Sequence, residues 1–169
     1  MAKRLKTKIG DIFSIPINEN EKRYMQLIAY DLTQLNSDVV RIFKKKYSLQ
    51  ESPIVTKILQ DDIYTYVHCS TDIGLKMDMW QKEENSHEIG DIESIIFRDT
   101  NDYGYNEGQD PIKISNNWSV WRINAKDFKY IGKLNGIYKN SYMGLVINPI
   151  GIVEIAKGNK YPPNYPDFE

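Results

Sequence analysis

Apolar and polar residues alternate with a period of two along much of this chain, and the first such segment lies near the N-terminus. Residues 11–17 carry Ile and Phe at strand-forming positions and follow a Gly-Asp turn pair. Residues 24–30 alternate in the same way beyond a polar turn at 18–22. Pro16 cannot donate a ladder hydrogen bond, which places it at an edge or a bulge. Together these features predict an N-terminal β-hairpin.

The strand pattern recurs along the chain. Further β-branched or alternating runs occupy residues 39–43, 63–69, 118–123 and 144–155. Helical signals are weaker: residues 35–47 fit an amphipathic helix, but their Val-Val-Arg-Ile-Phe centre favours a strand. We therefore predict a mainly β fold, an antiparallel small barrel or sandwich-like domain with few short helices. The alternation places ten residues in the core: Ile12, Phe13, Ile15, Ile28, Val40, Ile42, Val67, Ile95, Val120 and Ile147.

The chain length suits one domain, since 169 residues bury roughly two-thirds of the unfolded surface. We expect a single domain over residues 1–169, with a C-terminal hairpin at 136–158 and an extended, proline-rich tail at 159–169. Residues 52–60 fit a short helix or a turn equally well. The wholly polar run 81–88 is interpreted as a solvent-exposed loop.

Residues 88–95 match residues 8–15 at six of eight positions. The match fits a duplicated small-barrel unit, or only the common use of Gly-Asp before an aliphatic strand. The neighbouring residues do not continue the match, which favours the second interpretation.

Charge and cysteine content narrow the function classes. The formal net charge is −1, from 22 basic and 23 acidic residues, which argues against a dedicated nucleic-acid surface. The single Cys69 excludes an intramolecular disulfide and suits a reducing compartment. The basic N-terminus is not followed by an apolar signal-peptide run, and no stretch reaches the roughly 18 apolar residues of a spanning helix. We expect a cytoplasmic protein with no membrane or nucleic-acid partner.

No catalytic or metal-binding constellation stands out. His68 and His87 lack the spacing that places two ligands on one metal. His68 and Cys69 are adjacent in a strand, so they point to opposite faces, one inward and one outward, and do not form a nucleophile pair. The carboxylate pairs Asp61-Asp62 and Glu83-Glu84 suit a solvated surface. We therefore predict no enzymatic activity, no metal site and no cofactor.

An acidic segment with interleaved aromatics, residues 98–110, is the clearest candidate for binding. It holds four acids against one arginine, and it also holds two tyrosines and two glycines. Aromatic residues give large contact areas and carboxylates steer basic partners, although a solvated connection explains the same composition. The candidate partner-binding residues are Asp99, Asp102, Tyr103, Tyr105, Glu107 and Asp110.

The three tryptophans admit a core or an interface interpretation, and the core is favoured. Trp118 and Trp121 stand three apart, so on one strand they face opposite ways. One of them is then a candidate for exposure beside the acidic segment.

Several of these pieces, in this order, resemble the immunity protein 26 family of bacterial polymorphic toxin systems. They are the Gly10-Asp11 turn with its strand ending in Ile-Pro-Ile, then Trp80, then the segments 111–114, 118–122 and 130–134. The resemblance covers roughly residues 8–135. It implies a mainly β protein that protects a cell by binding a cognate toxin domain.

A second interpretation belongs to a different class. The opening Gly-Asp-Ile and hydrophobic strand also resemble the start of PemK-like endoribonuclease toxins, which implies a nuclease or a nucleic-acid-binding protein. The charge balance, and the lack of an arginine with a nearby acid or threonine constellation, count against this alternative.

Overall fold

The computed structural model describes residues 6–104 and 107–169. Eleven strands lie within these residues: β1 (Asp11–Pro16), β2 (Glu21–Asp31), β3 (Ser37–Phe43), β4 (Tyr47–Ser48), β5 (Ile63–Cys69), β6 (Gln81–Asn85), β7 (Ile96–Thr100), β8 (Trp118–Arg122), β9 (Lys129–Gly132), β10 (Tyr142–Met143) and β11 (Val146–Ile147). The helices are α1 (Val55–Leu59), α2 (Thr71–Lys76), α3 (Pro149–Lys157) and the 3-10 helix η1 (Gly136–Asn140).

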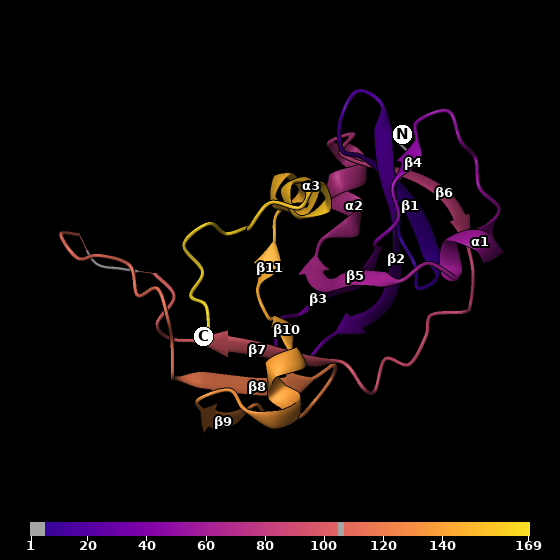
Figure 1. The fold of residues 1–169 in the computed structure, drawn as a ribbon. Coiled ribbons are helices and arrows are strands. Elements are labelled where there is room, and N and C mark those ends of the chain that lie inside the picture. Colours follow the sequence, from indigo (N-terminus) through magenta and orange to yellow (C-terminus); the bar gives the residue numbers. More distant parts are fainter. Residues whose placement is uncertain (1–5, 105–106) are drawn as a thin grey trace.

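The strands form two sheets, so the prediction of a mainly β, sandwich-like fold is confirmed. The larger sheet has the order β11-β5-β3-β2-β1-β6 with β4 paired to β2, and the smaller has the order β10-β7-β8-β9. Most neighbours are antiparallel, while β11 and β10 join their sheets in parallel. In Figure 1 the smaller sheet lies beneath one end of the larger sheet.

Each face of the larger sheet buries a different set of side chains. One face packs against residues from α3 and against Trp80, which follows α2; Phe13, Leu27 and Val67 belong to this cluster. On the other face, Ile28 and Val39 pack against Phe97 and Trp121 of the smaller sheet. Figure 1 shows α2 and α3 on the side of the larger sheet away from β7 and β8. All ten core residues expected from the alternation are buried.

The Gly-Asp turn has a specific physical reason. Gly10 has φ 97°, and a Cβ there would lie 2.5 Å from the Ser86 carbonyl oxygen. The Asp11 carboxylate is buried and accepts hydrogen bonds from the Lys8 N–H and from Asn85 Nδ2. It also pairs with Lys82 Nζ at 2.9 Å. The turn therefore joins β1 to β6 at the sheet edge.

The predicted C-terminal hairpin over 136–158 is wrong. The chain forms η1, then the two short strands β10 and β11 in different sheets, and then helix α3. The segment 142–147 thus links the edges of both sheets. A Cβ on Gly144 would lie 2.1 Å from the Trp121 ring, so only glycine lets this segment cross there.

Two other segments also differ from expectation. The polar run assigned to a loop contains β6, which pairs with β1 through its backbone while its charged side chains protect the free edge. Residues 91–95 form an irregular turn whereas the matching residues 11–15 lie in a strand, so their similarity does not mark a structural repeat. The undecided segment 52–60 contains helix α1.

Both tryptophans of β8 are buried, so neither is exposed as expected. They do face opposite ways: Trp118 packs with Leu134 and Tyr165, and Trp121 packs between the two sheets. The tail residue Tyr165 covers Trp118, with ring centroids 6.0 Å apart. The proline-rich tail bends and turns at residues 161–164, rather than lying extended throughout, and then packs Tyr165 and Phe168 against the smaller sheet as part of this second core layer.

Candidate functional site

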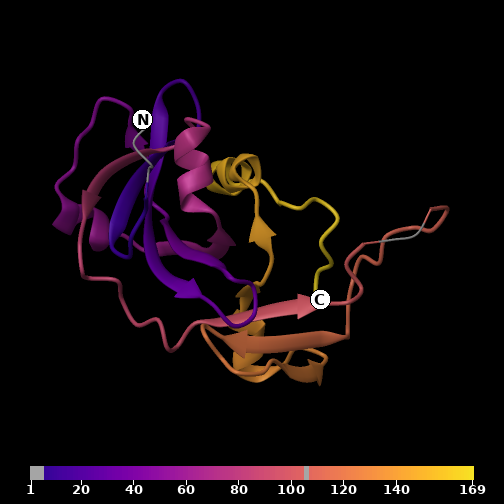
Figure 2. The ribbon, with the colours of Figure 1, turned by 180° about the vertical axis from the view of Figure 1, so that it is seen from behind.

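A long connection between β7 and β8, residues 101–117, projects from the body of the molecule. We call it the arm. Figures 1 and 2 show it extending away from both sheets, opposite to the side that carries α1. The arm contains most of the acidic segment singled out in the sequence, and its residues 105–106 are outside the described part of the structure.

A hydrogen-bond network holds the two ends of the arm together. Asp102 accepts from the Ser115 hydroxyl at 2.7 Å and from Asn117 Nδ2 at 3.0 Å. The Thr100 and Ser115 hydroxyls lie 2.8 Å apart and are buried. Further along, the backbone of Ser115 donates to Asp167 of the tail. The base of the arm is therefore built into the fold.

The structure divides the six predicted binding residues into three groups. Asp99 lies half-buried in β7 and Asp102 holds the base of the arm, so the tip carries fewer exposed acids than the composition suggests. Tyr103, Glu107 and Asp110 are exposed. Tyr105 lies outside the described residues.

Tyr103 remains 39% exposed although its ring packs 5.3 Å from that of Tyr165, centroid to centroid. One side of the ring is thus supported by the tail and the other is open to a partner. A supported, exposed aromatic ring suits an interface because little side-chain entropy is lost on binding.

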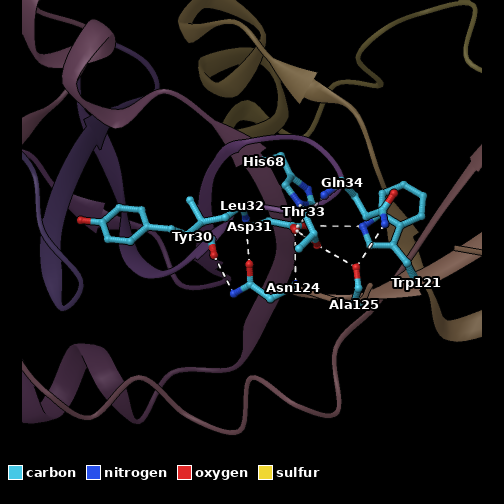
Figure 3. Close-up of polar contacts among 9 residues, drawn as sticks. All are labelled: Tyr30, Asp31, Leu32, Thr33, Gln34, His68, Trp121, Asn124 and Ala125. Carbon is cyan, nitrogen blue, oxygen red and sulfur yellow. Dashed lines mark hydrogen bonds and ion pairs between the residues drawn. The ribbon is translucent and has the colours of Figure 1, made fainter. Parts of the chain in front are cut away.

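A second polar cluster lies inside the molecule, where the two sheets meet (Figure 3). Asp31, at the end of β2, accepts from His68 Nε2 at 2.9 Å and from Trp121 Nε1 at 3.3 Å through Oδ2. Its Oδ1 accepts from the Asn124 N–H at 3.3 Å. Asn124 Nδ2 in turn donates to the Tyr30 carbonyl. One carboxylate thus connects β2, β5 and β8.

Burial sets the protonation of this pair. It lowers the pKa of His68 below the ordinary 6.5, against the opposing effect of the hydrogen bond that His68 donates to Asp31. Burial alone would raise the pKa of Asp31, but hydrogen bonds from His68 and Asn124 bring it below 3.8. We therefore assign a neutral imidazole that donates Nε2–H to an ionised carboxylate. In that tautomer the His68 Nδ1 atom carries no proton. It is buried and has no hydrogen-bond partner among the described residues.

The Asp31–His68 pair is a structural junction rather than an accessible acid–base pair, since both side chains are 0% exposed. The neighbouring Cys69 is also buried, on the opposite face of β5, so the expectation that one of these two residues faces solvent is wrong. Burial raises the pKa of the Cys69 thiol, which keeps it protonated.

Lowering the pH from 7 to 5 is expected to destabilise the protein through His68. The pKa of His68 in the folded protein is below its value in the unfolded chain, so the unfolded chain binds more protons in this range. The free energy of unfolding therefore decreases as the pH is lowered. The slope is at most about 1.4 kcal/mol per pH unit for one group. The stabilisation that results from the lowered pKa of Asp31 is lost at lower pH, as the pH falls below the ordinary aspartate pKa of 3.8.

Urea unfolding at several pH values measures this slope. His68→Gln, which keeps a donor for Asp31, is expected to flatten it. An identical slope in the His68→Gln variant and the wild type contradicts the assignment.

Patterns in the sequence did not identify Asp31, Gln34 or Asn124 as members of a polar cluster. Asp31 is the last residue of a strand and Asn124 adopts φ 58°, which Asn tolerates better than most residues, but these are ordinary turn signals. Their partners lie about 90 positions apart in the chain, and local patterns carry no information on such pairs. Only the folded chain reveals the junction.

No family model, curated protein or solved structure matches this chain. Within residues 6–104 and 107–169, no group of three or more His, Cys, Asp and Glu side chains is placed to hold a metal ion. No helix in the same part of the chain has the length and hydrophobicity required to cross a membrane.

Proposed function

We propose that this chain is an immunity protein that binds a cognate bacterial toxin domain and neutralises it without catalysis. The observation that carries the proposal is the arm. Hydrogen bonds of Asp102 with Ser115 and Asn117 hold the base of the arm together. Beyond the base the arm presents an exposed tyrosine ring and exposed carboxylates. A long surface loop on a rigid scaffold is a frequent location for binding residues.

The arm's chemistry suits a basic partner. Glu107 and Asp110 are exposed, and Lys113 is the only basic residue in the sequence of residues 101–117. Carboxylates at the rim of an interface increase the association rate with a positively charged surface, while a supported aromatic ring contributes to affinity. A nuclease toxin has such a positively charged surface, because it must bind phosphates.

The interior supports a binding protein over an enzyme. The one histidine–carboxylate pair among the described residues, Asp31 with His68, has no exposed side-chain surface and occupies a position that joins the sheets. In the proposed role the protein acts in the cytoplasm of the protected cell, where one buried cysteine is compatible with a reducing environment.

Co-expression tests the proposal. Where a toxin gene adjoins the gene for this chain, its toxin domain is expressed from an inducible promoter, alone and together with this chain. We expect the toxin to arrest growth, this chain alone to leave growth unchanged, and the pair to grow and to purify as a stable complex.

The same experiment separates the alternative class. Growth arrest by this chain alone, with cleavage of cellular RNA, contradicts the proposal and favours an endoribonuclease toxin. Arrest that persists on co-expression, with no complex formed, also contradicts it.

A further inference from the structure

A hollow of about 250 Å³ lies against the base of the arm. Its walls include Asp99 and Asn101, Ser119 and Trp121 of β8, Gln34 from the β2–β3 turn, and Phe128. Asp99 pairs with Ser119, and Phe97 with Trp121, across the β7–β8 ladder. Because alternate residues share a face of a strand, the side chains of Asp99, Ser119 and Trp121 point to the same side, where the hollow lies.

The side chains that line the hollow include one acidic residue, Asp99, and no basic residue. Asp99 Oδ1 accepts from the Thr100 N–H at 2.8 Å and from the Tyr165 hydroxyl at 3.1 Å. No Lys, Arg or His nitrogen among the described residues comes within 4.0 Å of this carboxylate. Burial raises the pKa of Asp99, against those two hydrogen bonds. A half-buried carboxylate without a cation gains free energy when one arrives.

The other walls fit the shape of a guanidinium group. Gln34 Nε2 donates to the carbonyls of Ala125 and Lys126, which leaves its Oε1 as the acceptor end. Trp121 and the 60% exposed Phe128 supply aromatic surface. The planar guanidinium group of arginine stacks on aromatic rings and donates two parallel hydrogen bonds to a carboxylate. The ammonium group of lysine is a compact point charge that lacks this planar geometry.

We infer that this hollow is a receptor for one arginine side chain of the protein partner, with Asp99 as its charge partner and Phe128 as a stacking wall. The inference rests on the proposed function and specifies it: the partner presents an arginine beside the surface that the arm contacts. Residues of the arm and of the hollow then form one continuous interface, because Asn101 belongs to both.

A small arginine probe tests the hollow without the toxin. N-acetyl-arginine methylamide is titrated into the full chain and followed by NMR, and the citrulline analogue serves as its uncharged match. We expect saturable shifts at the Trp121 indole N–H and at the Asn101 and Ser119 amides with the arginine probe only.

Variants locate the binding. Asp99→Asn keeps acceptors for Thr100 and Tyr165 but removes the charge, and we expect the dissociation constant to rise about tenfold or more. Phe128→Ala is expected to raise it about two- to fivefold. Asp62→Asn, an exposed acid outside both the hollow and the arm, is the control and is expected to change nothing.

Absence of saturable shifts, equal binding of the citrulline analogue, or unchanged binding in a folded Asp99→Asn variant overturns the inference. None of these results involves the toxin. The growth assay therefore decides the proposed function separately, and failure of one experiment is distinguishable from failure of the other.

Discussion

Asp31→Ala is expected to lower the free energy of unfolding by about 3–5 kcal/mol. The substitution leaves the buried donors His68 Nε2 and Trp121 Nε1, and also the Asn124 N–H, without their acceptor. An unsatisfied buried donor costs about 1–3 kcal/mol, and folded domains have only about 5–15 kcal/mol in total. The loss removes the contact that holds β2, β5 and β8 together. Urea unfolding at pH 7 measures it.

Two further variants make this result interpretable. Asp31→Asn keeps one acceptor oxygen and is expected to lose less stability than Asp31→Ala, which preserves a measurable folded state. Asp127→Ala removes an exposed carboxylate and is expected to shift the free energy of unfolding by less than about 0.5 kcal/mol. A cost of less than about 1 kcal/mol for Asp31→Ala would contradict a structural role for this carboxylate in joining β2, β5 and β8.

Substitutions in the arm are expected to alter toxin binding in two different ways. Tyr103→Ala removes a supported ring, so we expect faster dissociation and a loss of about 2 kcal/mol or more in binding free energy. Glu107→Gln with Asp110→Asn removes exposed charge, so we expect slower association and a weaker dependence on ionic strength. Surface plasmon resonance at several salt concentrations separates the two effects.

Asp102→Asn distinguishes the scaffold of the arm from its binding surface. Its carboxylate accepts from Ser115 and Asn117, so this change is expected to loosen the arm rather than to remove a rim charge. We expect weaker binding with an unchanged salt dependence. Unaltered binding by Tyr103→Ala, by the Glu107–Asp110 double variant and by Asp102→Asn, in folded proteins, would place the interface elsewhere.

Strand patterns in the sequence predicted the core well, because alternation records burial directly. The hairpin of β1 and β2 and the strands β3, β5 and β8 lie where the pattern places them. Helix α3 was missed because its Ile and Val residues resemble a strand. Its boundaries did carry signals: Asn148 caps the N-terminus through the Gly151 N–H, Pro149 follows, and Gly158 ends it with φ 98°.

The candidate site was only partly predictable. Composition identified the acidic, aromatic segment, but it gave no means to distinguish the half-buried Asp99 and the hydrogen-bonded Asp102 from the exposed Glu107. Those differences depend on Tyr165 and Ser115, which contact the segment only in the folded chain. The hollow and the Asp31 junction form where turns that are distant in the sequence meet in space, so no local sequence pattern predicts them.

Hydrogen exchange of the chain, free and bound to the toxin domain, tests the location of the interface most directly. We predict that the toxin slows exchange in the arm, residues 101–117, and in the segments around Gln34 and Phe128, while α2, α3 and β6 exchange as in the free protein. Protection confined to those helices or to β6, with unchanged exchange in the arm, would contradict it.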